Sequence, residues 1–324
     1  MRHTLRTMLV GGGVLPAALS AQAPVSDFHQ HLFSPAAAAL VTGDSGSPGI
    51  RARDVVALLD AAGIRRALVL SVAYTWSKAS REPVDDEYRR VREENDWTAQ
   101  EVSPYPDRLR AFCSLNPLRP YAMEELTRCS AHPLLRHGLK LHFGNSDVDL
   151  GNPENVAQVR KVLEAANRHG MAIVVHLRTA LDLGRRYGAD AARVFLDELL
   201  PAAPDVAVQI AHLAGAGGYD AATDSALGVF TDAIARQDPR VKHVWFDVAA
   251  VVRPEMGRDE LQRIAARIRQ VGVGRVLYGS DAAASPDAWP GAGWAAFQRL
   301  PLGGDEFRAI AANVAPYMRA CPAQ

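Results

Sequence analysis

The chain has 324 residues, 48% of them hydrophobic and 22% charged, which are typical values for a globular protein with a substantial core. Its 36 basic and 36 acidic side chains balance, so no overall charge favours nucleic acid or an anionic membrane surface. We therefore expect a small-molecule ligand and no nucleic-acid partner. The composition allows a homo-oligomer but does not set its size.

Residues 1–23 have the pattern of a secretory signal. A basic start precedes the short apolar run Met8–Leu15, and small residues follow as far as Ala23. The apolar run is too short and too rich in glycine to span a bilayer. Cleavage after Ala23 and cleavage after Ser20 both fit. We expect a periplasmic or secreted protein with a mature domain of 24–324 and no membrane insertion, and a cytoplasmic protein with an unstructured leader is the alternative.

After the leader, short apolar runs alternate with longer amphipathic stretches. Nearly continuous apolar runs are typical of parallel strands that are buried on both faces. The candidate strands are Val25–His29, Ala67–Val72, Leu109–Leu115, Gly138–Phe143, Met171–Leu177, Val206–His212, Val244–Val248 and Arg275–Gly279.

Helical patterns fill the segments between these runs. They are Ala52–Ala62, Asp86–Val102, Tyr121–His132, Glu154–His169, Ala189–Leu200, Asp220–Gln237, Asp259–Val271 and Asp305–Met318. Eight strand–helix units without a long linker favour one closed (β/α)₈ barrel over an open doubly wound sheet. The first strand is not followed by Gly-x-Gly-x-x-Gly, which argues further against a dinucleotide-binding fold.

The three cysteines are Cys113, Cys129 and Cys321. Their spacing fits neither a metal site nor a redox motif, and an odd number argues against a disulfide framework. Cys113 lies in an apolar run, so we expect it to be a small core residue.

Metal-type side chains follow several of the strands directly. His29 and His31 are two residues apart, so on a strand both point to the same face. His176, His212 and Asp281 each end or follow a later apolar run. Strand ends of this kind meet at one mouth of a barrel, where active sites lie. We expect His29, His31, His176 and Asp281 to bind a divalent metal, with a further position open for water or substrate.

This ordered set resembles the amidohydrolase superfamily, and most closely its amidohydrolase-related branch, which contains the aminocarboxymuconate-semialdehyde decarboxylase-like enzymes. The resemblance extends from Asp27 to Asn313 and implies a metal-dependent enzyme. In members of the decarboxylase-like branch one metal is bound and the sixth-strand histidine, here His212, stays free for catalysis. We therefore expect one ion, with Zn²⁺ as the first choice.

Lys140 and His142 also match the superfamily pattern, because Gly138–His142 is similar to its fourth-strand Gly-x-Lys-x-His. In some members this lysine is carboxylated and bridges two metals, so a two-metal site is the alternative. Without that bridge, Lys140 is a candidate for binding an anionic substrate group. His142 either reaches the substrate or packs the mouth, and Arg178 is a candidate anchor for a substrate carboxylate.

Two reactions fit these residues. In a hydrolase of a carboxylic ester, lactone or amide-type carbonyl, Asp281 would take a proton from the metal-activated water and pass it to the leaving group. His212 would stabilise the oxyanion or orient the water. The alternative is a non-oxidative decarboxylase of an unsaturated or aromatic carboxylic acid. A non-catalytic exported binding protein is the third hypothesis, and the intact set of candidate ligands argues against it.

Overall fold

The structure, a computed structural model, describes residues 22–78, 80–180, 183–283 and 289–319. Most of the expected signal segment, residues 1–21, therefore lies outside the described residues. A sheet of eight parallel strands in the order β1 to β8 confirms the predicted barrel. The strands are β1 (Ser26–Gln30), β2 (Arg66–Leu70), β3 (Leu109–Ser114), β4 (Gly138–His142), β5 (Ala172–His176), β6 (Val208–Ile210), β7 (Val244–Asp247) and β8 (Val276–Leu277).

The barrel closes between the segment that contains β8 and strand β1. The Phe28 amide donates to the Tyr278 carbonyl at 2.8 Å, and the Asp281 amide donates to the His29 carbonyl at the same distance. These two bonds carry the sheet past the short β8. They also fix the backbone of Asp281 directly beside that of His29.

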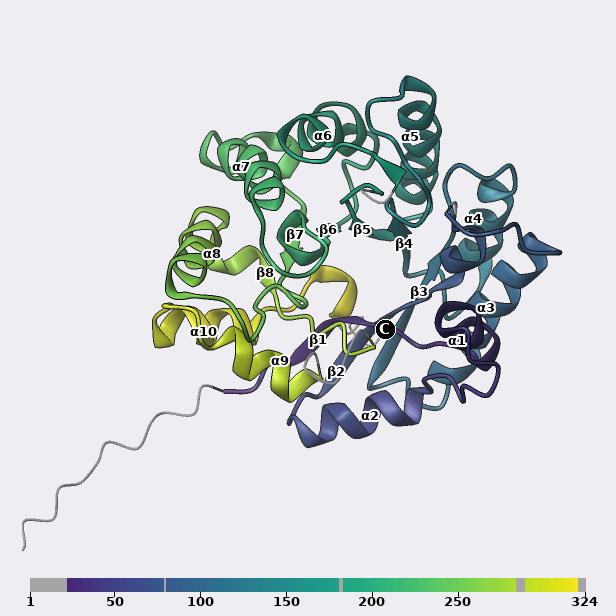
Figure 1. Ribbon diagram of the computed structural model, residues 1–324, viewed down its shortest axis with the longest axis horizontal. Helices are drawn as coiled ribbons and strands as arrows, with labels where there is room; N and C mark the ends of the chain where they lie inside the picture. The colour runs from purple at the N-terminus through teal and green to yellow at the C-terminus, as the bar shows by residue number, and fades with distance from the viewer. Residues whose placement is uncertain (1–21, 79, 181–182, 284–288, 320–324) are drawn as a thin grey trace, which may run out of the picture.

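Helices surround the strands (Figure 1). They are α1 (Pro35–Thr42), α2 (Ala52–Ala61), α3 (Glu87–Val102), α4 (Ala122–Ala131), α5 (Pro153–Arg168), α6 (Ala189–Val194), α7 (Ala221–Ala235), α8 (Arg258–Val271), α9 (Pro290–Phe297) and α10 (Gly304–Ala312). Shorter turns are η1 (Ala73–Ser77), η3 (Phe195–Leu199), η4 (Leu200–Ala202), η5 (Ala211–Ala214), η6 (Pro239–Val241), η7 (Val273–Arg275) and η9 (Pro316–Met318). No helix in the described part of the chain is long and apolar enough to cross a membrane.

Each predicted strand is present, and the predicted helices differ mainly at their ends. Helices α1 and α9 were not predicted, because each is short and begins with a proline inside a loop-like sequence. The predicted helix Asp305–Met318 is wrong at its C-terminal end. The α-helix ends at Ala312, and a separate turn begins at Pro316, which cannot continue a helix.

The turn η9 closes the floor of the barrel. The Tyr317 ring packs edge-on against Phe28 and Phe112, with ring centroids 6.2 and 5.3 Å apart. The Tyr317 hydroxyl donates to Oε1 of Gln209 on β6. The C-terminal segment is therefore part of the barrel interior, on the side away from the strand ends where the predicted site lies.

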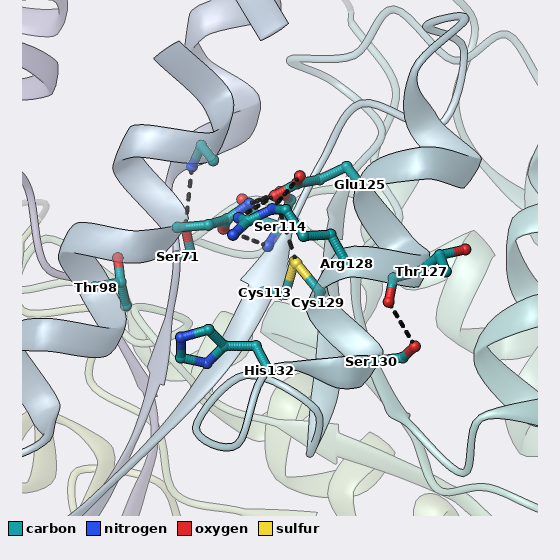
Figure 2. The surroundings of a disulfide bond; sticks show 12 residues. Ser71, Thr98, Cys113, Ser114, Glu125, Thr127, Arg128, Cys129, Ser130 and His132 are labelled. Atoms are coloured by element: carbon teal, nitrogen blue, oxygen red, sulfur yellow. Dashed lines mark hydrogen bonds and ion pairs between the residues drawn. A yellow bond between two sulfur atoms is a disulfide. The ribbon is translucent and has the colours of Figure 1, made fainter. Parts of the chain in front are cut away.

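Cys113 and Cys129 form a disulfide, so the expectation of an unpaired core Cys113 was wrong (Figure 2). The bond joins β3 to α4 across Cα atoms 6.2 Å apart, and both cysteines are fully buried. The odd cysteine count misled the sequence analysis because Cys321 is the residue left over. The pairing follows from the packing of α4 on β3, which no cysteine spacing reveals.

We expect the double variant Cys113→Ser/Cys129→Ser to lose about 2–4 kcal/mol of unfolding free energy, because the disulfide restricts the unfolded chain. Denaturant unfolding followed by circular dichroism measures this loss. A reductant should destabilise the wild type and leave the double variant unchanged. Equal stability of the two proteins under oxidising conditions would contradict the expectation.

Candidate metal centre

Five histidine rings form a continuous row at the C-terminal ends of the strands. Centroids are 3.9 Å apart between His142 and His176, 5.1 Å between His176 and His212, 4.7 Å between His212 and His29, and 5.1 Å between His29 and His31. The structure thus brings together all the histidines that the sequence analysis selected. They come from β1 and the residue after it, from β4 and β5, and from the segment after β6.

A bulge in β1 sets the direction of His29. Asp27 pairs with Ala67 of β2 and Gln30 pairs with Val69, so β1 holds one extra residue between these pairs. The Asp27 carboxylate accepts the His29 amide at 3.0 Å and the Ser280 amide at 3.1 Å. It therefore braces the bulge and ties it to the residue before Asp281.

His29 and His31 each hold the tautomer that a metal ligand needs. Nδ1 of His29 donates to Oδ2 of Asp247 at 3.0 Å, and Nδ1 of His31 donates to the Leu70 carbonyl at 2.7 Å. Both rings therefore keep a lone pair on Nε2. Nε2 of His31 lies 3.6 Å from Oδ1 of Asp281. Ligand atoms of His29, His31 and Asp281 lie within 4.8 Å of one another, which fits the spacing around one small cation.

Asp247, at the end of β7, is the residue that the sequence analysis missed. Its fully buried carboxylate accepts Nδ1 of His29 at 3.0 Å, Nε2 of Gln209 at 2.5 Å, the His212 amide at 2.9 Å and the Ala249 amide at 3.1 Å. Its ligand atom also groups with those of His29 and His212 within 4.8 Å. The available signal was its place directly after the apolar residues of β7, the same placement that identified His176.

His212 lies on a left-handed turn that an ordinary residue adopts at a cost. The φ angles of His212, Leu213 and Ala214 are 55°, 51° and 67°, and Asp281 has a φ of 58°. Each such residue costs about 1–2 kcal/mol, and strain of this kind concentrates at functional sites. Nδ1 of His212 donates to the Ala249 carbonyl at 2.7 Å, so its Nε2 also keeps a lone pair.

His176 reaches the cluster but stands apart from the ligand groups. Its ring lies between those of His142 and His212 and is almost fully buried. Among the described residues, the sets of atoms within 4.8 Å do not include it. Its role as a metal ligand therefore stays a prediction.

Lys140 lies at the centre of the site. Its Nζ is 3.4 Å from Nε2 of His29, and the side chain is 1% exposed. Desolvation lowers the lysine pKa to about 8, and the charges of Asp247 and Asp281 oppose that shift. The amine thus occupies the side of His29 from which a metal would be bound, which is where a bridging carboxylated lysine would have to lie.

The protonation states suit a divalent cation. Burial lowers the pKa of His31 to about 3 and also lowers that of His212, so both rings are neutral at pH 7. Burial raises the pKa of Asp281, but electrostatic attraction to the surrounding imidazole rings and to Lys140 outweighs this effect, and the net shift is downward. Neutral imidazoles beside an ionised carboxylate are the ligand forms that a metal requires.

Arg178 is held by another carboxylate. Its guanidinium binds Asp220 through two bonds of 2.9 and 2.7 Å, and Asp220 caps the N-terminus of α7. The structure therefore places Arg178 in an ion pair, and the predicted contact with a substrate carboxylate would compete with Asp220.

A mostly apolar cavity of about 270 Å³, which Gln30 and Asp54 also line, borders His31. Its walls include Ile50, Val55, Leu58 and Trp289. Beside it, Gly279 allows the chain after β8 to approach β1, since a Cβ there would lie 2.8 Å from Cβ of His29. The backbones of β1 and the segment after β8 are therefore closely packed. The neighbouring cavity beside His31 has room for an apolar group.

A model of the amidohydrolase family matches residues 26–313, which is most of the chain. The chain belongs to the amidohydrolase family. It is therefore a metal-dependent enzyme of the amidohydrolase superfamily, as the resemblance implied. No curated protein sequence matches it at a significant level.

Solved structures share the fold at low sequence identity. One is 5-carboxyvanillate decarboxylase from Sphingomonas paucimobilis, with 18% identity, a TM-score of 0.58, and coverage of 90% of this chain and 97% of that one. A probable 2-pyrone-4,6-dicarboxylic acid hydrolase from Acinetobacter baumannii has 16% identity, a TM-score of 0.60, and coverage of 89% and 96%. The 5-carboxyvanillate decarboxylase from Novosphingobium aromaticivorans, solved with manganese, has 13% identity, a TM-score of 0.59, and coverage of 91% and 96%.

We expect Asp247→Asn to weaken metal binding by about 10- to 100-fold, because His29 loses the carboxylate that fixes its tautomer. Competition with a chromogenic chelator measures the affinity, and elemental analysis counts the ions per chain. Asp238→Asn is the control, since Asp238 binds Arg240 in the segment that leads into β7. Unchanged metal affinity in Asp247→Asn would show that Asp247 does not support the site.

Proposed function

We propose that the protein is a metal-dependent hydrolase that acts on a carboxylic ester, lactone or amide-type carbonyl. One observation carries the proposal: two proton acceptors, the Asp281 carboxylate and Nε2 of His212, belong to two groups of candidate metal ligands that share His29. Hydrolysis needs an acceptor for the proton of water. A decarboxylase instead needs a group that delivers a proton to carbon, and an ionised Asp281 does not suit that task.

One divalent ion, held by His29, His31, His176 and Asp281, is the proposed cofactor. Three nitrogen ligands and one oxygen ligand favour Zn²⁺. When bound, the ion supplies Lewis-acid polarisation and a water of lowered pKa. Two ions bridged by a carboxylated Lys140 are the alternative, and the ion count in the Asp247 experiment separates the two.

In this proposal the residues divide the proton transfers between them. Asp281 accepts a proton from the attacking water and returns it to the leaving group. His212 orients that water by accepting a hydrogen bond at Nε2, because its Nδ1 proton is already given to the Ala249 carbonyl. Of the two roles predicted for His212, the orientation of water fits the neutral ring better than donation to an oxyanion.

Decarboxylation is the second candidate. The structural neighbours named above include decarboxylases, and Lys140 supplies a buried amine next to the metal-binding histidines. A panel of aryl esters, lactones, anilides and aromatic carboxylic acids tests both reactions on the metal-loaded enzyme. Release of carbon dioxide from an acid, with no ester, lactone or amide cleaved, would overturn the hydrolase proposal.

We expect Asp281→Asn to lower kcat by about 10²–10⁴-fold, because the amide cannot accept the proton of water. Steady-state kinetics on the best substrate of the panel measures the loss. Since Asp281 is also a proposed ligand, each assay is normalised to the bound metal. Asp60→Asn is the control, because Asp60 binds Arg108 on the surface. A metal-loaded Asp281→Asn enzyme with wild-type kcat would exclude Asp281 as the base.

We further propose that the protein is exported. The buried Cys113–Cys129 disulfide supports this, because disulfides persist in oxidising compartments and are rare in the cytosol. Expression of the full chain in a bacterial host should place it in the periplasmic fraction, and intact-mass analysis should show a start after Ser20 or Ala23. A cytoplasmic product that retains Met1 would contradict the proposal.

A further inference from the structure

His142 has a hydrogen-bond pattern that sets it apart from its neighbours. Its Nδ1 accepts the backbone amide of Asn145 at 3.1 Å. A ring nitrogen that accepts a hydrogen bond carries no proton, so the proton of this ring lies on Nε2. The Nε2 atom of His142 therefore carries a proton and acts as a hydrogen-bond donor, with no lone pair free to bind a metal.

The neighbouring histidines show the opposite arrangement. Nδ1 of His29, His31 and His212 donates to a carboxylate or to a backbone carbonyl, which leaves each Nε2 as an acceptor or ligand. One metal-type row thus contains rings of two kinds. Only a ring with its proton on Nε2, such as His142, can donate this N–H to a bound molecule without losing a hydrogen bond to the protein.

The backbone after β4 holds the His142 ring in this state. The Ser146 amide donates to the His142 carbonyl at 3.0 Å, so the turn folds back over the ring. At Gly144 a Cβ would lie 3.4 Å from Cε1 of His142 and 3.2 Å from the Arg178 carbonyl. The tautomer is therefore set by main-chain geometry, which does not change with the protonation of any neighbour.

The position of the ring makes the donor available to a ligand. His142 is half-buried at the end of β4, stacked on His176 at 3.9 Å and packed against Tyr74 at 4.9 Å. Within the described ranges, Nε2 of His142 has no hydrogen-bond partner from the protein.

The charges around the mouth give the substrate an orientation. His142 places a donor on the β4 side, Lys140 reaches from the same strand to His29, and Asp247 and Asp281 place carboxylates on the side of β7 and β8. A carboxylate or carbonyl oxygen of the substrate is attracted to the donors on the β4 side. The apolar cavity beside His31 lies on the side away from β4, because β1 and β4 are three strands apart in the barrel.

We propose that His142 is a substrate-binding residue whose fixed Nε2–H donates to a carboxylate or carbonyl oxygen of the substrate on the β4 side of the mouth. It is not a metal ligand. The substrate class is then a molecule with an apolar end and an acceptor oxygen at the other end. The inference rests on the proposed function only in placing the substrate at this mouth.

Two variants of His142 separate the donor from the rest of the ring. In His142→Asn the side-chain oxygen replaces Nδ1 and still accepts the Asn145 amide, but no donor stands where Nε2 was. In His142→Gln the amide nitrogen replaces Nε2. His132→Asn is the matched control, because Nδ1 of His132 also accepts a backbone amide, that of Leu134, at the C-terminus of α4.

Benzoate is the probe, and isothermal titration calorimetry on the metal-loaded proteins gives its Kd. We expect His142→Asn to weaken benzoate binding by about 10- to 100-fold, the value of one hydrogen bond to a charged group. His142→Gln and His132→Asn should stay within about threefold of the wild type. All three variants should bind as much metal as the wild type.

A second measurement does not depend on any ligand. Long-range ¹⁵N–¹H correlation spectra of histidine-labelled protein distinguish the two tautomers, and the signal that is missing in His142→Asn belongs to His142. An Nε2–H form supports the proposal. An Nδ1–H form, the loss of an ion in His142→Asn, equal benzoate affinity of His142→Asn and the wild type, or no benzoate binding by the wild type would each overturn it. These measurements need no turnover, so they stand even if the hydrolase assays fail.

Discussion

The buried Asp247 carboxylate is the group on which the site depends. It bonds to the His29 ring on β1, the Gln209 side chain on β6 and the His212 amide after β6. An unpaired carboxylate in this position would cost several kcal/mol, so these donors have to converge on it. Burial raises the pKa of Asp247, but the attraction of the His29 ring and the hydrogen bonds from His29 and the His212 amide lower it by more, so the carboxylate stays ionised. The position of His29, and with it the metal centre, follows from this one charge.

The sequence predicted the barrel and the mouth because both depend on local patterns. An apolar strand run can be read from consecutive residues, and the C-terminal end of each run marks the mouth, which located His176, His212 and Asp281 without coordinates. The bulge at Asp27–Gln30 could not be predicted in this way, since it is defined by the partner residues Ala67 and Val69. The disulfide and the support from Asp247 are also contacts between distant segments, and no periodicity encodes them.

The site concentrates features that do not favour stability. His212 and Asp281 adopt left-handed backbone, Lys140 is buried as an amine, and several imidazoles stand ring to ring. Bonds from a bound cation to the imidazole lone pairs and the carboxylate would offset much of this unfavourable free energy. The Cys113–Cys129 bond and the apolar layer between strands and helices are the opposing contributions.

The turn η9 has a consequence for biosynthesis. Tyr317 donates to Gln209, and Gln209 donates in turn to Asp247, so the last described turn of the chain is joined to the metal centre through two side chains. The ribosome synthesises this turn only after all eight strands of the barrel have been made. A nascent chain that stops before Pro316 would have all eight strands but no floor beneath Gln209. A prematurely ended chain would therefore lack the contact that orients Gln209, one of the donors to Asp247, even though it carries every metal-type residue.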